Sequence, residues 1–258
     1  MAVLNLGDRV LYWRTDGDPA KVPLVLLNSL GTDQSLWEPV VAHLLDDFYV
    51  LRMDKRGHGG STNVGDVCDM ADLSRDVLAV MDAAGWHKAH VAGVSIGGMM
   101  GMWLGVHASE RVERLVLSNT GAKMPTESLD LRVKLIRETE SIEPIVDIAL
   151  ERFFTADFIE AASPLYHTLR EVFRQCDPDG YLACCAAIRA MDQREDVVRI
   201  QAPTLIINST YDLSAPPALG EFLFNQIPDA ELVEMPLAHL PMSQDPQGYA
   251  QILKSFLL

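Results

Sequence analysis

The sequence predicts an α/β fold, in which a mostly parallel sheet is covered by helices on both faces. Three observations favour it: short apolar runs recur along the chain, helical segments separate them, and one long helical stretch interrupts the alternation. Strands that are nearly continuous runs of leucine and β-branched residues suit a parallel sheet, because helices cover it above and below. The 258 residues are enough for one large domain with a core of its own.

Five apolar runs are predicted to be buried strands. They are "VPLVLLN" (22–28), "FYVLRMD" (48–54), "AHVAGV" (89–94), "RLVLSN" (114–119) and "PTLIINS" (203–209). The first residues, around Gly7-Asp8, are typical of an antiparallel hairpin that precedes the alternating pattern.

Two of the intervening helices have clear ends. Residues 70–85 carry apolar side chains at helical spacing and stop at Gly85. Residues 245–258 open with Asp245 as N-cap and Pro246 at the first helical position, and continue as an amphipathic helix.

The alternation breaks between about Ala122 and Val197, where the sequence is helical and has no strand-like run. Strand patterns resume at Pro203. We therefore expect a core formed by residues 1–121 and 198–258 and a helical cap formed by residues 122–197.

The overall charge excludes some classes of partner. Lys and Arg number 21 and Asp and Glu 36, for a formal net charge of −15. Nucleic acid and anionic membranes attract basic surfaces, so neither is expected as a partner. A small anionic substrate is compatible with this charge, because one local arginine can outweigh a distant average. Oligomeric state cannot be read from the sequence.

The remaining composition predicts a cytoplasmic protein without cofactor or metal. No stretch approaches the roughly 18 apolar residues of a membrane span, and the first residues lack the pattern of a secretory signal. The four cysteines lack the spacing of a metal-ligand set and are expected to be reduced thiols. The seven histidines include no H-E-x-x-H pair.

The stretch "AGVSIGGMM" (92–100) carries the strongest functional pattern. Ser95 lies between Gly93 and Gly97, directly after a predicted strand and before a predicted helix. In that setting G-x-S-x-G is a nucleophile elbow, a turn so tight that side chains two residues before and after the serine would collide. The hydroxyl then projects above the sheet at a helix N-terminus, which favours a developing negative charge. A glycine-rich turn with an incidental serine is the alternative.

A serine hydroxyl needs a base, and in this architecture the partners follow in the order acid, then histidine. Asp212 comes just after one strand and His239 after the next apolar run, where such sheets build their sites. His239 would take the serine proton, and Asp212 would fix the imidazole tautomer. Asp212 could instead only cap its turn. Asp229 and Asp245 are rival acids, but they resemble a turn residue and a helix cap.

The transition state also needs an oxyanion hole. One donor is expected to be the backbone N–H of Ile96, the residue after the nucleophile. The other is expected from the loop "NSLGTDQSLW" (28–37), in which Leu30 occupies the position whose amide should point inward.

With these residues in place, the chain resembles the α/β-hydrolase superfamily, and more narrowly the 3-oxoadipate enol-lactone hydrolases. The matching stretches include "MDKRGHGGS" (53–61), "LLNSLGTDQSLW", "GVSIGGMMG", "RLVLSNT", "GYLACCAAIRAMD" and "IQAPTLIINSTYD". The resemblance implies an α/β-hydrolase fold with an eight-stranded sheet. It also implies opening of 3-oxoadipate enol-lactone to 3-oxoadipate through an acyl-enzyme, in the β-ketoadipate pathway of aromatic catabolism.

The same resemblance implies a substrate that carries a free carboxylate. Arg152, in "LERFF", matches an arginine of the family and is the expected cation for it, since guanidinium binds carboxylate bidentately. The alternative is a solvated helix residue. Phe153 stands where the family typically has tryptophan. It and Trp37 are further expected substrate contacts.

The same sequence features are compatible with other functions. A general carboxylesterase or perhydrolase could use the same scaffold, and a small-molecule receptor could bind without turnover. Epoxide hydrolases and haloalkane dehalogenases are disfavoured, because they use an aspartate nucleophile where this chain has Ser95.

Overall fold

The computed structural model describes residues 2–62 and 68–258, so residue 1 and residues 63–67 of the predicted core lie outside the described residues. One eight-stranded sheet has the order β1-β2-β4-β3-β5-β6-β7-β8. Its strands are β1 (Ala2–Asn5), β2 (Val10–Asp16), β3 (Val22–Leu27), β4 (Phe48–Met53), β5 (Ala89–Val94), β6 (Val112–Ser118), β7 (Thr204–Ser209) and β8 (Ala230–Met235).

The sheet is antiparallel only where β2 pairs with its two neighbours. β2 pairs antiparallel with both β1 and β4, and the pairs from β4 to β8 are parallel. β5 and β7 are buried along their whole length, as the continuous apolar runs predict. The mostly parallel sheet, the N-terminal hairpin and the five predicted strands are confirmed, with ends that shift by one or two residues.

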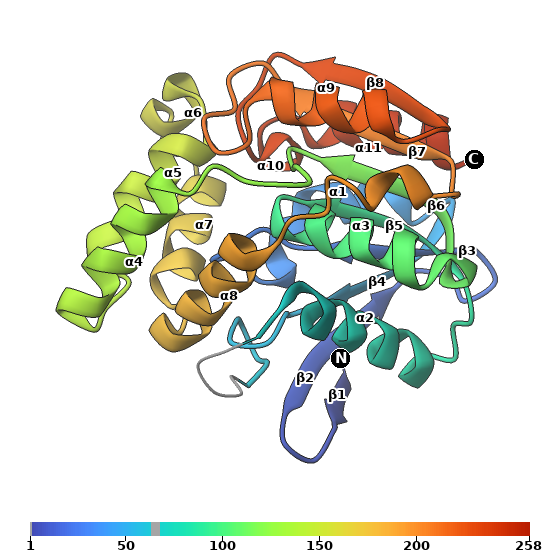
Figure 1. Ribbon diagram of the computed structural model, residues 1–258, viewed down its shortest axis with the longest axis horizontal. Helices are drawn as coiled ribbons and strands as arrows, with labels where there is room; N and C mark the ends of the chain where they lie inside the picture. The colour runs from blue at the N-terminus through green and yellow to red at the C-terminus, as the bar shows by residue number, and fades with distance from the viewer. Residues whose placement is uncertain (1, 63–67) are drawn as a thin grey trace.

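Helices cover both faces of this sheet (Figure 1). α2 and α3 pack on each other on one face, and α1 and α11 pack on each other on the opposite face. The helices outside the 119–203 stretch are α1 (Glu38–Leu44), α2 (Met70–Ala83), α3 (Ile96–His107), α9 (Pro217–Gln226), α10 (Pro241–Gln244) and α11 (Pro246–Leu257). Asp245 caps α11 by accepting the N–H of Gly248, as expected.

The chain between β6 and β7 is helical and forms no strand. It holds α4 (Glu127–Thr139), α5 (Val146–Phe153), α6 (Ala156–Glu160), α7 (Pro164–Arg174) and α8 (Pro178–Ala190). Figure 1 shows α4 to α7 standing together beyond one end of the sheet, with α8 leading back toward it. The division into a core and a cap with the predicted boundaries stays a prediction, and we use the word cap for these helices.

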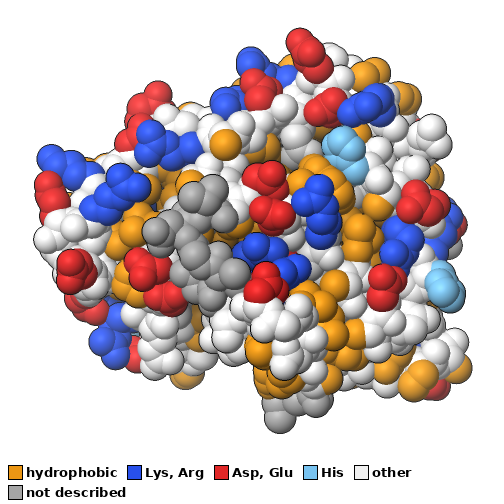
Figure 2. Space-filling model, turned by 60° about the horizontal axis from the view of Figure 1, so that its bottom comes forward, with side chains coloured by type: hydrophobic (Ala, Val, Ile, Leu, Met, Phe, Trp, Pro, Cys, Tyr) orange, Lys and Arg blue, Asp and Glu red, His pale blue; other side chains and the backbone are white. Residues whose placement is uncertain are grey.

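Opposite charges are interspersed on the face of the molecule that Figure 2 shows. In Figure 2, Lys and Arg side chains lie beside Asp and Glu rather than gathering in one basic patch. In the described ranges, no helix combines the length and the apolar character that crossing a bilayer requires. The four cysteines are buried free thiols.

Candidate active site

Ser95 occupies the turn between β5 and α3 in an unusual backbone conformation. Its φ is 57° and its ψ is −122°, outside the regions that non-glycine residues normally adopt. Such strain is typical of functional sites and persists only where the surroundings enforce it. The N–H of Ser95 donates to the carbonyl of Ser118 at 3.0 Å, which fixes the turn against β6. The side chain is 7 % exposed.

The glycines on both sides of Ser95 make this turn possible. A Cβ on Gly93 would lie 2.3 Å from backbone atoms of Gly97, and one on Gly97 would lie 2.3 Å from the carbonyl oxygen of Leu27. Both distances are far shorter than a normal non-bonded contact, and the backbone atoms cannot move far enough to avoid the collision. The spacing of the two glycines therefore follows from packing of the helix start on the sheet.

Asp212 and His239 are joined by a short hydrogen bond. His239 Nδ1 lies 2.7 Å from Asp212 Oδ2, and both side chains are buried. The other oxygen of Asp212 accepts the N–H groups of Ser214 and Ala215 at 2.7 and 2.9 Å. Asp212 thus caps its turn and holds the imidazole at once, so the two alternatives for this residue do not exclude each other.

The sheet topology gathers these residues at one edge. Ser95 follows β5, Asp212 follows β7 and His239 follows β8, and these parallel strands end on the same side of the sheet. Asn119, at the end of β6, donates from Nδ2 to the carbonyls of Ala238 and His239 at 3.1 and 3.0 Å. The loop that carries the imidazole is therefore tied to the strand between β5 and β7.

The two predicted oxyanion donors have free N–H groups. Leu30 follows β3 and Ile96 begins α3, and both residues are buried. Within the described part of the chain, neither backbone N–H donates a hydrogen bond. A buried N–H without a partner is costly unless a ligand completes it. Leu30 and Ile96 remain the expected donors to a bound oxyanion.

Of the predicted substrate contacts, Phe153 is stacked on the imidazole. The Phe153 and His239 rings have centroids 5.2 Å apart and planes 27° apart. Trp37 is fully buried, donates from Nε1 to Asn28 Oδ1 at 2.9 Å and packs on Tyr249. These contacts hold Trp37 in the core, and its part as a substrate contact stays a prediction.

Arg152 lies between the cap and the loop of Asp212. Its guanidinium donates to the carbonyl of Leu213, and the side chain is half-buried. Burial and the positive charge of Arg132 lower the pKa of Arg152, which the charge of Asp212 partly offsets. Arg152 and Arg132 are therefore close enough for their charges to interact.

Arg132 is a residue that the sequence reasoning missed. It lies on α4, is 5 % exposed, and donates to the Tyr181 hydroxyl at 2.7 Å and the Ser128 carbonyl at 3.2 Å. None of these partners is a carboxylate. Arg132 lies three residues after Leu129 and four before Ile136, so it shares the apolar face of α4. This helical spacing is the signal in the sequence that could have identified it.

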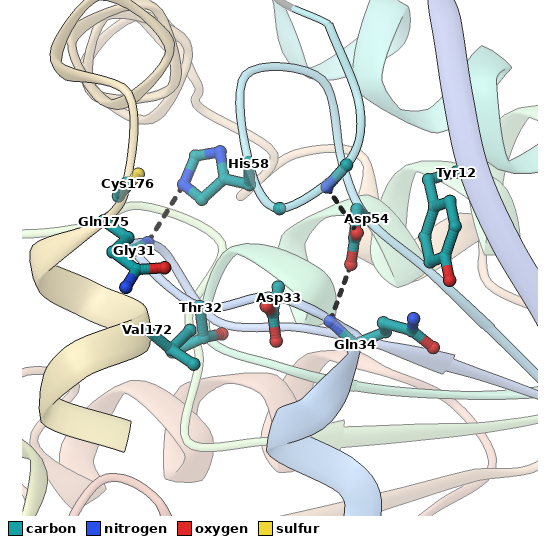
Figure 3. A pocket seen from close by; sticks show the side chains of 12 residues that line it. Tyr12, Gly31, Thr32, Asp33, Gln34, Asp54, His58, Val172, Gln175 and Cys176 are labelled. Atoms are coloured by element: carbon teal, nitrogen blue, oxygen red, sulfur yellow. Dashed lines mark hydrogen bonds between the residues drawn. The ribbon is translucent and has the colours of Figure 1, made fainter. Parts of the chain in front are cut away.

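A cavity of about 310 Å³ adjoins the loop after β3 (Figure 3). Asp54 lines it and accepts the N–H of Gln34 at 2.7 Å and of Gly60 at 2.9 Å. Burial raises the pKa of Asp54 to about 6, although both hydrogen bonds oppose the shift.

In the ranges that the structure describes, no three His, Cys, Asp or Glu side chains gather as metal ligands would.

Known proteins match the chain along its length. Residues 22–177 match the family model described as alpha/beta hydrolase fold. The 3-oxoadipate enol-lactonase 2 of Acinetobacter baylyi is 31% identical over 255 residues, which cover 98% of this chain and 95% of that protein. A relative from Caulobacter sp. (strain K31), named for carbamate hydrolysis, is 28% identical over 231 residues, 86% of this chain and 85% of its own.

A solved structure matches as well. The crystal structure of the enol-lactonase from Burkholderia xenovorans LB400 has a TM-score of 0.96 and 35% identity, and the match covers 99% of both chains. The likeness therefore extends over the sheet and the helices between β6 and β7 alike.

Proposed function

We propose, from the premise that this chain belongs to the α/β-hydrolase family, that it opens 3-oxoadipate enol-lactone with a triad of Ser95, His239 and Asp212. The family and the resemblance to enol-lactone hydrolases are established by the matches, as is the α/β-hydrolase fold. The observation that carries the proposed mechanism is the buried Asp212–His239 pair, which lies at the carboxyl ends of the strands, where Ser95 is also held in its strained turn.

The chemistry begins with the imidazole. An ionised Asp212 keeps the proton of His239 on Nδ1, which leaves Nε2 free to take the hydroxyl proton of Ser95. The serine oxygen then attacks the lactone carbonyl, and the N–H groups of Leu30 and Ile96 stabilise the oxygen that becomes negative. Collapse breaks the ring ester bond, and the His239 imidazolium gives its proton to the leaving enolate oxygen, so the acyl-enzyme carries an enol that becomes the ketone. The neutral imidazole of His239 then takes a proton from water, whose oxygen attacks the acyl carbonyl. Collapse of this second intermediate breaks the bond to Ser95, which takes the proton back from His239 as the product leaves.

The two cap arginines support a substrate with a carboxylate. The described hydrogen bonds of Arg132 and Arg152 go to neutral oxygens, so both guanidinium groups keep unpaired charge at the cap. A buried cation without an anion is costly. A bound carboxylate would offset that cost for Arg132 and would extend the site toward Arg152. This reasoning favours 3-oxoadipate enol-lactone, in the β-ketoadipate pathway, over a neutral ester.

Burial of the site implies that the cap, residues 122–197, controls access. Ser95 and His239 are 7 % and 1 % exposed, and Phe153 of α5 covers the imidazole. The N–H of Leu240 also donates to the carbonyl of Phe153 at 3.1 Å. We expect the cap or its loops to move when a substrate binds, as lids do in many enzymes.

The experiment follows enol-lactone absorbance with the purified protein, without added metal or nucleotide. Ser95→Ala should lower the rate by about 10⁴-fold or more and abolish labelling by a serine-directed phosphonate. Ser109→Ala is the matched control, because Ser109 lies just past the other end of α3. A near-normal rate in Ser95→Ala would exclude the mechanism.

The substrate class is tested with a panel. It contains the enol-lactone, the same lactone without its carboxylate, an aryl ester and a carbamate. Arg152→Ala should raise KM for the carboxylate-bearing lactone far more than for the neutral one, and equal effects would remove Arg152 from the site. Faster turnover of the aryl ester would instead favour a general esterase, and faster turnover of the carbamate would favour the activity for which the Caulobacter relative is named. Phosphonate labelling without turnover of any compound would favour a receptor.

A further inference from the structure

Lys55 is a buried cation that has no role in the proposed mechanism. It follows β4 and Asp54 and is 3 % exposed. Its ammonium donates to the carbonyl oxygens of Ser29 at 2.6 Å and Thr32 at 2.9 Å. Moving an ammonium out of water costs several kcal/mol, and neutral carbonyls offset less of that cost than a carboxylate would. Both of these contacts lie on the loop after β3.

The contact with Ser29 acts on the peptide group that carries a predicted oxyanion donor. The carbonyl of Ser29 and the N–H of Leu30 belong to one peptide, and in a planar trans peptide they point to opposite sides. A cation bound to the carbonyl oxygen therefore holds the Leu30 N–H pointing away from itself. It also polarises the peptide, which makes that N–H a stronger donor.

The rest of the same loop is held from the segment after β4. The N–H of Thr32 donates to the carbonyl of Ser29, which closes a turn, and Gly31 within it has a φ of +76°. His58 Nε2 accepts the N–H of Gly31 at 3.0 Å, and Asp54 accepts that of Gln34 (Figure 3). His58 and Asp54 thus fix peptides beyond the donor, whereas Lys55 binds the donor peptide itself.

We propose that Lys55 is a positioning residue for the oxyanion hole, whose ammonium orients and polarises the Ser29–Leu30 peptide toward the substrate oxygen that Ser95 makes negative. This inference rests on the proposed function, because it needs an acyl-transfer reaction at Ser95. It predicts that Lys55 contributes to the transition state rather than to binding of the ground state.

The first test replaces the charge with a side chain of similar shape. Lys55→Met should lower kcat by about 10- to 100-fold, less than the loss of a whole donor, and should leave KM within about threefold. Affinity for an alkylboronic acid, whose adduct with Ser95 places an oxygen in the oxyanion hole, should fall by the same factor as kcat. Lys55→Gln keeps a neutral donor and should be intermediate in both measurements.

Arg56→Met is the matched control. Arg56 is the next residue, is also buried, and binds Asp76 and the carbonyl of Asp72 on α2 rather than the loop after β3. Arg9 also pairs with Asp76, so the carboxylate keeps a partner. We expect an unchanged kcat and boronic-acid affinity for Arg56→Met at temperatures where circular dichroism shows every variant folded.

A pH profile separates positioning from general support of the fold. Burial lowers the pKa of Lys55 below its usual 10.5, so its charge is lost at a lower pH than that of an exposed lysine. The charged and titratable groups that face the ammonium are Cys176, Cys184, Asp33, Asp54 and His58.

Cys176 and Cys184, the two thiols that face the ammonium, bind their protons more tightly than an exposed thiol does. Burial raises the pKa of Cys176 to about 12, and a hydrogen bond with Cys68 together with burial raises that of Cys184. Asp54 and His58 lose their protons in the acidic range, since the pKa of Asp54 is about 6 and burial lowers that of His58 well below 6.5. The wild-type kcat should therefore decline on the alkaline side, and this decline should be absent from Lys55→Gln.

Two results would overturn the inference: an unchanged kcat in Lys55→Met, or the same alkaline decline in Lys55→Gln as in the wild type. Should Lys55→Met fail to fold, the pH profile and boronic-acid affinity of Lys55→Gln decide alone. Failure of the proposed function looks different, because the wild-type protein would then hydrolyse none of the panel.

Discussion

The Asp212–His239 pair at the ends of the strands and Arg132 in the cap are buried polar groups with opposite kinds of partner. At the sheet edge, Asp212 has three described donors, and Asn119 ties down the loop of His239. In the cap, Arg132 is buried with only neutral partners. The Asp212–His239 pair therefore has its partners before substrate arrives, whereas the charge of Arg132 stays unpaired.

This difference separates reactivity from selection. A preformed set of donors and acceptors lowers the cost of reorganisation during the reaction. Unpaired buried charge instead favours whichever ligand brings the opposite charge. On this view, substitutions at the sheet edge should change kcat, and substitutions in the cap should change KM for charged substrates.

The largest expected effect is at the sheet edge. Asp212→Asn should lower kcat by about 10⁴-fold, because an amide no longer fixes the proton on Nδ1 of His239. The measurement is steady-state hydrolysis of the enol-lactone, with KM changed little. Asp229→Asn is the control, since that rival acid lies in the turn before β8. A larger loss in Asp229→Asn than in Asp212→Asn would reverse the assignment of the acid.

A second test concerns stability at the sheet edge. The folded-state pKa of Asp54, about 6, lies above the ordinary value of 3.8, so the folded state binds its proton more tightly than the unfolded state. Its contribution to stability is therefore fully present below pH 3.8 and is lost as the pH rises through 6. The linked free energy is about 3 kcal/mol.

Asp54→Asn removes that titration. Relative to the wild type, its free energy of unfolding should rise by about 2 kcal/mol between pH 4 and pH 7. Urea unfolding at several pH values measures the difference, in which the titration of other carboxylates cancels. Parallel stability curves for the two proteins would show that Asp54 keeps an ordinary pKa.

The third test addresses the cap. Arg132→Met should raise KM for the carboxylate-bearing lactone by about 10²-fold, as expected when one member of a buried charge pair is removed. KM for the neutral analogue should change little, and kcat should be retained. Lys134→Met is the matched control, because that cation lies on the same helix with an exposed side chain. Equal KM changes for both lactones would mean that Arg132 supports the cap rather than the substrate.

The smallest expected effect is at Trp37. Trp37→Phe removes the indole N–H that Asn28 accepts and should cost about 1 kcal/mol of stability, with KM unchanged. Thermal unfolding and steady-state kinetics measure the two quantities. A marked rise in KM without loss of stability would support the predicted substrate contact instead.

The strands and the elbow could be predicted because their causes are local. The run at 89–94 is apolar since β5 is buried on both faces, and Gly93 avoids a collision with the backbone of Gly97, four residues later. Gly97 itself avoids Leu27 on β3, a cause that is not local. The order of Asp212 and His239 along the chain could be predicted from a local cause as well, since each follows a strand. The distance between their side chains could not be predicted, because it depends on the sheet topology.

Lys55 and Arg132 could not be predicted because their causes lie far along the chain. Lys55 stands in a polar loop, and its partner Ser29 lies 26 residues earlier. Arg132 contacts Tyr181, which lies 49 residues later. In each case a charged residue suggests a solvated surface, and tertiary packing removes the solvent.

The stacking of Phe153 on His239 offers a way to observe this enzyme at work. An aromatic ring 5.2 Å from the imidazole and nearly parallel to it shifts the magnetic resonance of the His239 ring protons by its ring current. Since Phe153 belongs to α5, displacement of that helix would return the resonance toward its ordinary position. A single proton signal would then report when α5 covers the imidazole of His239 and when it has moved away.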